Sequence, residues 1–192
     1  MKDERVIGLS GSSDAYSRFL KGDAGALEEI ITEYKDGLIL YLNGYVKNLD
    51  TAEELAEDTF VRLFIKKPKN KGGASFKTWL YTIGRNLAID HLRKEKRRRT
   101  EPLDSRYDLA DEQNLEEEFF REERRLTVHR AMNKLKAEYR EALWLTYFEG
   151  LSNKETAAVL NKSVHSVEML ISRARAALKK ELEKEGFIYE NE

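Results

Sequence analysis

The sequence predicts an all-α protein made of two small helical domains joined by an acidic linker. Charged residues make up 36% of the 192 residues, and the chain contains only two prolines. Few segments alternate apolar with polar residues as strands do. A hydrophobic fraction of 41% suits modest cores better than one large core. We expect domains at residues 1–99 and 125–186, a linker at 100–124 and a polar tail at 187–192.

The first domain is expected to contain three helices. Apolar residues recur in steps of three and four over residues 27–46, which predicts an amphipathic helix. Asp50 and Thr51 offer the cap of a second helix, whose apolar stripe leaves acidic side chains on its outer face. The segment 66–75 breaks this helix because it contains a proline and two glycines. A third helix is predicted to begin near Phe76 and to end in a basic run.

The second domain is also expected to be helical. Apolar positions predict one helix near residues 126–135 and another over residues 139–150, where a glycine terminates it. Residues 152–155 form a capping box, S-x-x-E, which opens a short helix. Ser163 caps the next helix, which is predicted to run to about residue 182.

Residues 151–178 have the pattern of a helix-turn-helix, in which the second helix can enter the major groove of duplex DNA. An ordinary αα-hairpin packed on another helix would give the same pattern. The outward face of the second helix is expected to hold Ser163, His165, Ser166, Glu168, Met169, Ser172 and Arg173, with Arg175, Lys179 and Lys180 placed for phosphates. Glu168 can accept a hydrogen bond from a cytosine amino group, but it repels phosphate.

The formal net charge of −1 is a cancellation of blocks. Residues 1–61 carry −7, residues 62–100 carry +11, residues 101–124 carry −7 and residues 125–192 carry +2. The overall balance argues against a uniformly basic nucleic-acid binder, whereas the +11 block is an electrostatic footprint for a polyanion. The acidic linker is either a solvated spacer or a tether that follows a basic channel on a partner or shields the protein's own basic face.

The basic block also contains aromatic residues, namely Phe76, Trp79, Tyr81 and His91. Cations beside aromatic rings suit unstacked single-stranded bases, because phosphates bind the cations and each stacked base contributes ~1–3 kcal/mol. We expect the ring of Trp79 to lie in the core. The loop at 66–75 and the polar stripe along the third helix are the better candidates for binding DNA.

Several classes of function are disfavoured. The chain has no cysteine and three scattered histidines, which argues against thiol nucleophiles, disulfides and metal centres. Its apolar stretches are far shorter than the ~18 residues of a membrane span, and its first residues lack the apolar core of a secretory signal. No nucleotide-binding loop or nucleophile–base pair is evident. We therefore expect a cytoplasmic protein that is not an enzyme and that has no catalytic residue, cofactor, metal or membrane insertion.

Four segments carry a resemblance to the extracytoplasmic-function (ECF) sigma factors of bacterial RNA polymerase. Residues 52–60 (AEELAEDTF) and 76–93 (FKTWLYTIGRNLAIDHLR) resemble region two of that family. Residues 139–157 (YREALWLTYFEGLSNKETA) and 167–175 (VEMLISRAR) resemble region four. The blocks occur in the expected order around an acidic linker, and the resemblance covers about residues 14–184.

The resemblance implies that the chain binds core RNA polymerase, directs it to promoter DNA and helps to open the duplex. It also implies a sequestering anti-sigma partner, and we expect no obligate homo-oligomer. Core-polymerase contacts then fall on Glu54, Leu55, Glu57, Asp58 and Arg62. Minus-ten DNA contacts fall on Lys69, Asn70, Lys71, Ser75, Lys77, Arg85, Asn86, Asp90, Arg93, Lys94 and Arg97. Minus-thirty-five DNA contacts fall on Ser163, His165, Ser166, Glu168, Met169, Ser172, Arg173 and Arg175.

The sequence departs from the family pattern at three places. Lys136 stands where proline is common, at a helix boundary. Asn161 replaces a common turn glycine and tolerates the left-handed conformation. Residues 168–170, Glu-Met-Leu, replace the more basic Lys-Ser-Arg, which affects the expected minus-thirty-five contacts rather than the fold.

Two other functions stay open at this point. One is a helix-turn-helix regulator whose N-terminal domain senses a ligand or dimerises. The other is a helical interaction protein that inhibits polymerase without reading DNA. A sensor domain would not need a +11 block after an acidic helix, so the sigma interpretation accounts for more of the chain. It also predicts poor DNA binding in the absence of polymerase.

Overall fold

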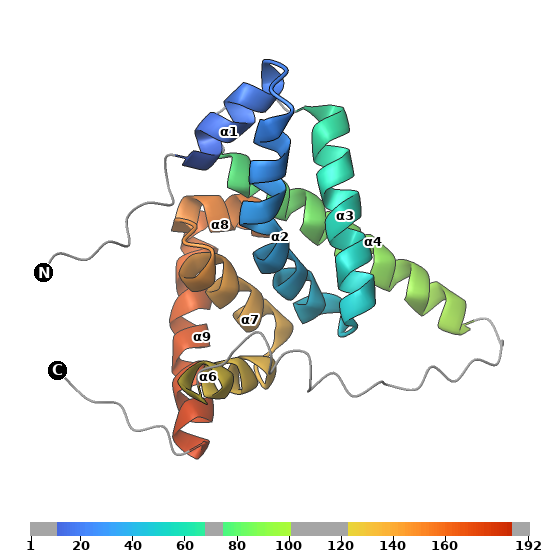
Figure 1. The fold of residues 1–192 in the computed structure, drawn as a ribbon. Coiled ribbons are helices and arrows are strands. Elements are labelled where there is room, and N and C mark those ends of the chain that lie inside the picture. The colour runs from blue at the N-terminus through green and yellow to red at the C-terminus, as the bar shows by residue number, and fades with distance from the viewer. Residues whose placement is uncertain (1–10, 68–74, 101–122, 186–192) are drawn as a thin grey trace, which may run out of the picture.

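The computed structural model describes residues 11–67, 75–100 and 123–185, and every regular element within these ranges is a helix (Figure 1). The elements are α1 (Gly11–Leu20), α2 (Gly25–Val46), α3 (Leu49–Lys66), α4 (Phe76–Thr100), α6 (Glu123–Asn133), α7 (Ala137–Leu143), η1 (Trp144–Phe148), α8 (Asn153–Leu160) and α9 (Val164–Lys184). The predicted all-α class is confirmed. None of the described helices is long and apolar enough to cross a membrane.

Helices α1–α4 form the first unit, which packs around the buried face of α2. Leu38 and Leu42 of α2 and Leu80 of α4 are fully buried there. Gly84 lets the backbone of α4 approach its neighbours closely, because a Cβ at this position would lie 3.1 Å from Leu38 Cδ1 and 3.3 Å from Thr59 Oγ1. Helix α4 therefore contacts both α2 and α3.

The boundaries of α2 and α4 agree with the sequence pattern, but the start of α3 does not. The predicted cap at Asp50 and Thr51 is wrong, because the N-cap is Asn48. Its side chain accepts a hydrogen bond from the Thr51 N–H at 2.8 Å. This bond satisfies one of the donors that the first turn of a helix leaves without a partner. Helix α3 ends where Lys67 adopts a left-handed conformation, with φ 41°.

Helix α1 is absent from the sequence-based expectations. Its few apolar residues are nevertheless well packed: the ring of Tyr16 lies 4.6 Å from that of Phe76. Phe19 meets Phe64 edge-on, with 4.9 Å between the ring centroids. A helix of this length is marginal by itself. Packing against α2 and aromatic contacts with α3 and α4 therefore hold α1 in place.

Helices α6–α9 with η1 form the second unit. The expected helix over residues 139–150 is confirmed in part, since α7 continues into a π-helical turn that the sequence does not indicate. The Glu149 N–H donates to the Trp144 carbonyl at 3.1 Å, which is the five-residue step of a π-helix. Gly150 follows with φ +66°, so the expected glycine stop is confirmed.

Helices α8 and α9 form the predicted helix-turn-helix. The capping box is present, because Ser152 Oγ accepts from the Glu155 N–H and Glu155 accepts from the Ser152 N–H. Asn161 adopts the expected left-handed conformation, with φ 54°. Ser163 then caps α9 by accepting from the Ser166 N–H at 3.1 Å. Local capping therefore defines both ends of the turn.

The two units pack against each other. Helix α4 contacts α8, and α2 contacts α7. Buried residues of both units belong to one continuous apolar cluster. In Figure 1 the second unit lies alongside α2, while the C-terminal half of α4 projects away from it. The contact between the units is called the interdomain interface below.

Candidate nucleic-acid interface

Helix α9 presents one exposed and one buried face. Val167, Ile171 and Ala174 lie on the buried face, toward the other helices of the second unit. All eight residues predicted to contact the minus-thirty-five element are exposed: Ser163, His165, Ser166, Glu168, Met169, Ser172, Arg173 and Arg175. Glu168, Ser172 and Arg175 share a shallow groove with Asn153 of α8. The predicted reading face of α9 is thus assembled and accessible.

Helix α4 divides the residues predicted to contact the minus-ten element into two groups. Along its outer face Asn86, Asp90, Arg93, Lys94 and Arg97 are exposed. Ser75, Lys77 and Arg85 instead face the interdomain interface and are half-buried. Lys69, Asn70 and Lys71 lie outside the described residues.

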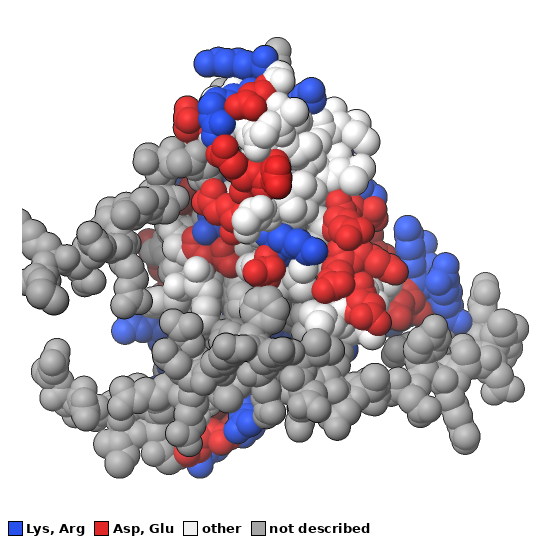
Figure 2. Space-filling view, viewed as in Figure 1, with Lys and Arg blue, Asp and Glu red and all other residues white. Residues whose placement is uncertain are grey.

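Helix α3 carries the acidic surface predicted to contact polymerase. Glu54, Glu57, Asp58 and Arg62 are exposed, whereas Leu55 is only 7% exposed and packs in the core. Figure 2 shows acidic side chains gathered over α3 beside basic side chains on the projecting end of α4. The first unit therefore presents surfaces of opposite charge next to each other, which suits two different partners.

The interdomain interface pairs acidic residues of the second unit with polar residues of the first. Arg85 Nε donates to Glu141 Oε1 at 2.6 Å. Lys77 Nζ lies 3.1 Å from Glu149 Oε2 and donates to the Glu149 carbonyl at 2.5 Å. Ser75 Oγ donates to Glu155 at 2.6 Å. The sequence offers no local signal for the first two contacts, because 56 and 72 residues separate the partners.

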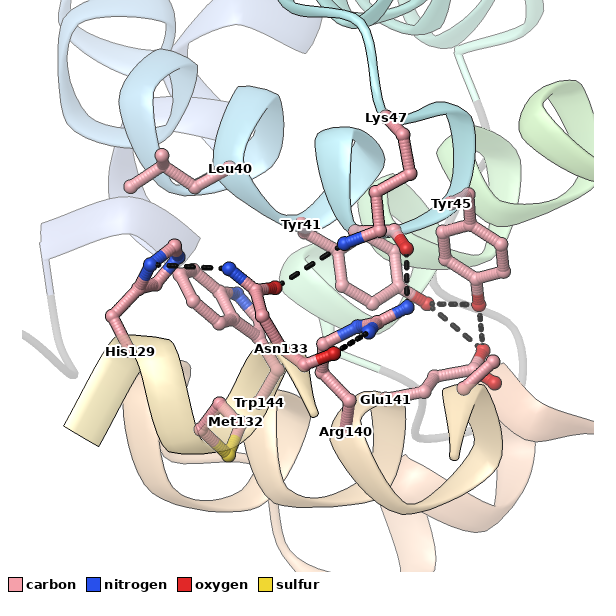
Figure 3. Close-up of a pocket in the computed structure, with 12 residues that line it drawn as sticks. Leu40, Tyr41, Tyr45, Lys47, His129, Met132, Asn133, Arg140, Glu141 and Trp144 are labelled. Carbon is pink, nitrogen blue, oxygen red and sulfur yellow. Dashed lines mark hydrogen bonds between the residues drawn. The ribbon is translucent and has the colours of Figure 1, made fainter. Parts of the chain in front are cut away.

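Glu141 lies at the centre of a buried polar cluster (Figure 3). The hydroxyl of Tyr41 donates to Glu141 Oε1 at 3.2 Å, and the hydroxyl of Tyr45 donates to the same atom. Burial raises the pKa of Glu141 to about 7, against the opposing effects of the Tyr41 hydrogen bond and of Lys162. A carboxyl group in this position titrates close to neutral pH.

A second polar cluster follows the same interface. The Arg140 guanidinium donates to the Gly44 carbonyl at 2.5 Å, and Lys47 Nζ donates to Asn133 Oδ1 at 3.2 Å. The Asn133 side chain also reaches His129 Nδ1 at 3.3 Å. Burial, together with the nearby charges of Lys47 and Arg140, lowers the pKa of His129 to about 4. These residues, drawn in Figure 3, line a small cavity of about 30 Å³.

These two groups predict opposite pH dependences of stability. The raised pKa of Glu141 means that stability falls as pH rises from about 4.5 to about 7. The lowered pKa of His129 means that stability falls as pH drops from about 6.5 to about 4. Between pH 5 and pH 6.5 the two contributions oppose each other, so the wild-type profile should be nearly flat.

Replacing His129 with glutamine should unmask the contribution of Glu141. Relative to wild type, His129→Gln should gain about 2 kcal/mol of unfolding free energy between pH 7.5 and pH 5, measured by urea denaturation. His165→Gln, at an exposed position of α9, is the control and should follow the wild-type profile. An unchanged profile for His129→Gln would contradict the assignment of these shifts.

Within the described ranges, no three His, Cys, Asp or Glu side chains come together as a metal site would require. The two polar clusters at the interdomain interface instead form hydrogen bonds between the two units. The arrangement is suited to binding macromolecules through exposed charged helices.

Comparisons with known proteins match both units to the same kind of protein. Residues 30–98 match the sequence model of Sigma-70 region 2, and residues 125–178 match that of Sigma-70, region 4. The chain is 30% identical over 175 residues to the RNA polymerase sigma-H factor of Pseudomonas aeruginosa, covering 86% of this chain and 91% of that protein. It is 32% identical over 171 residues to the ECF RNA polymerase sigma factor SigW of Bacillus subtilis, covering 84% and 91%.

A solved structure has a similar arrangement. CnrH, solved in complex with the cytosolic domain of CnrY, superposes with a TM-score of 0.63 and 25% identity. The match covers 91% of this chain and 98% of CnrH. The fold described here, including both units, therefore has a counterpart among solved proteins.

Proposed function

Because the chain belongs to the ECF family of RNA polymerase sigma factors, it binds core polymerase and recognises promoter DNA, and we propose how its parts divide this work. Residues 1–99 form the region-two domain and residues 125–186 the region-four domain, joined by the linker 100–124 and followed by the tail 187–192. The region 2 match lies within the first domain and the region 4 match lies within the second.

The observation that carries this division is the presence of separate exposed surfaces on the two domains. We assign minus-ten DNA to the α4 surface and to Lys69, Asn70 and Lys71, and minus-thirty-five DNA to the exposed face of α9. We assign core polymerase to the acidic face of α3, which consists of Glu54, Glu57, Asp58 and Arg62. Leu55 does not belong to this surface, because it is buried. Neither DNA surface needs to bind tightly, because polymerase supplies proximity and couples the two sites.

The proposed contribution to DNA melting requires no catalytic group. A surface that binds unstacked bases better than duplex shifts the equilibrium toward the open promoter by that difference in affinity. We infer that the chain catalyses no reaction itself. Its action is placed in the cytoplasm, because the polymerase and the promoter are there.

The regulator alternative assigned the N-terminal half to sensing or dimerisation. The match of residues 30–98 to Sigma-70 region 2 favours the sigma interpretation of that half instead. The sigma interpretation explains both the +11 block and the acidic helix that precedes this block.

We further propose an anti-sigma partner. CnrH was solved with the cytosolic domain of a second protein, CnrY. In this chain an apolar groove between α6, η1 and α9, lined by Val128, Tyr147, Phe148 and Leu178, has basic residues at its edge, Arg175 and Lys179. An amphipathic helix with acidic flanks fits this combination.

The proposed function is tested by reconstituted transcription. Core polymerase from the source bacterium, genomic promoter fragments and the purified chain should give run-off transcripts that start at defined positions, whereas core polymerase alone should not. Arg173→Ala should weaken initiation about tenfold, because α9 loses a DNA contact. Lys184→Ala, at the far end of α9, should have no effect. Tight duplex binding without polymerase, together with no stimulation of transcription, would overturn the proposal.

A further inference from the structure

Three glutamates of the region-four domain contact three residues assigned to minus-ten DNA. Glu141 pairs with Arg85, Glu149 pairs with Lys77, and Glu155 accepts a hydrogen bond from Ser75. These contacts line up along the first half of α4, where the two domains meet. The acidic groups come from α7, from the residue after η1, and from α8.

The contacts are not ordinary surface ion pairs. The side chain of Glu141 is 10% exposed and that of Glu149 is 9% exposed. Glu149 Oε1 also accepts a hydrogen bond from Trp144 Nε1 at 3.1 Å. Glu155 accepts additional hydrogen bonds from Ser152 of its own capping box. The carboxylates of Glu149 and Glu155 are therefore also held by residues of their own domain. The Glu141 carboxylate is instead held by the other domain, through Tyr41, Tyr45 and Arg85.

A carboxylate and a phosphate make the same kind of contact with arginine, lysine and serine donors. A donor occupied by a buried glutamate is not available to a DNA phosphate. We propose, on the basis of the proposed function, that Glu141, Glu149 and Glu155 occupy the minus-ten surface as phosphate mimics. The closed arrangement then masks one half of α4 until the domains separate.

The masking is selective. Arg93 and Lys94 on the projecting half of α4 stay exposed, and so does the reading face of α9. The closed chain can therefore still meet duplex DNA, but it lacks the complete surface for the opened strand. Separation of the domains is the step that completes this surface.

Gly37 of α2 offers a way to test the closed arrangement without changing a charge. A Cβ at Gly37 would lie 2.9 Å from Glu149 Oε1 and 3.2 Å from the Tyr81 hydroxyl. The alanine must displace the Glu149 carboxylate. In the middle of a helix the same substitution otherwise favours the fold. Gly44→Ala is the matched control on the same helix, because its Cβ would meet its nearest neighbour, Arg140 Nε, at an ordinary 3.5 Å.

The experiment measures domain separation and single-strand binding in the full chain. The chain has no cysteine, so Lys35→Cys and Lys154→Cys, both at exposed positions, can carry a donor–acceptor dye pair. The DNA probe is a fluorescein-labelled dT20 oligonucleotide, since binding to phosphates and stacking tolerate any sequence. The triple variant Glu141→Gln, Glu149→Gln, Glu155→Gln should lower energy transfer and bind dT20 at least tenfold more tightly. Gly37→Ala, which displaces only the end of the Glu149 side chain, should change both in the same direction by less.

Two controls separate opening from other effects. Glu138→Gln, Glu183→Gln and Glu185→Gln, at exposed positions of the same domain, remove the same charge away from the interface. This triple variant and Gly44→Ala should behave as wild type. Equal dT20 affinity in wild type and in an opened variant overturns the masking, as does unchanged energy transfer in the triple interface variant. Failure of the proposed function would appear separately, as absence of promoter-specific transcripts with core polymerase for wild type and variants alike.

Discussion

Replacing Arg93 and Lys94 together with alanine should lower promoter opening by the reconstituted holoenzyme about a hundredfold or more. Both residues lie on the projecting half of α4, and the Arg93 side chain is 70% exposed. Each can place a charge on a phosphate, and a charged hydrogen bond contributes about 1.5–3 kcal/mol. In a plot of the logarithm of the binding constant against the logarithm of the salt concentration, the slope should become shallower by about 2, one for each lost phosphate contact.

Opening can be followed by the fluorescence of 2-aminopurine placed in the minus-ten element, over a series of salt concentrations. The matched control is Lys21→Ala with Lys35→Ala, which removes the same charge from exposed positions on α2 and the turn before it. This control should retain nearly full opening. An equal loss in the control would mean that net charge, rather than the α4 surface, determines the result.

Leu38→Ala should lower the free energy of unfolding by about 2–5 kcal/mol, because it leaves a cavity at the fully buried centre of the first unit. This is a large part of the ~5–15 kcal/mol that stabilises a typical domain. Gly84→Ala should cost about 1–3 kcal/mol, since its Cβ would meet Leu38 Cδ1 at 3.1 Å. Urea denaturation measures both changes.

Combining Gly84→Ala with Leu38→Ala tests whether the cost of Gly84→Ala comes from the contact with Leu38 or from a general loss of stability. Gly84→Ala should cost less in the Leu38→Ala background, because the nearest obstacle has been removed. Leu20→Ala is the matched surface control, at a side chain that is 37% exposed, and should change stability by less than about 1 kcal/mol. A Gly84→Ala cost that is identical in both backgrounds would contradict the packing described for α4.

Most of the helices could be predicted because their apolar residues recur with the helical period and their ends carry capping residues. The helix-turn-helix is the clearest case, since Ser152, Glu155 and Ser163 all make the predicted caps. The cap of α3 was harder to predict, because Asn48 and Asp50 are similar capping residues two positions apart. Nothing local in the sequence separates them.

The features that could not be predicted depend on contacts between distant parts of the chain. Helix α1 is held by aromatic rings of α3 and α4, which no local pattern in its own sequence reveals. Leu55 belongs to both the apolar stripe and the acidic neighbourhood of α3, and the fold assigns it to the core. Glu141 and Glu149 gain their partners only when the two domains pack. The assigned DNA and polymerase contacts stay predictions.

Trp144 gives the interdomain interface an optical signal of its own. Its indole ring is buried, stacks on Phe148 with 4.6 Å between centroids and lines the small cavity beside Tyr41 and Arg140. The other of the two tryptophans, Trp79, lies in the first unit against Tyr16. Mutating Trp79 to phenylalanine would leave Trp144 as the single tryptophan of the chain, to be excited selectively at the interface. The wavelength of its emission would then follow the hydration of this contact in the free chain in real time, without a dye.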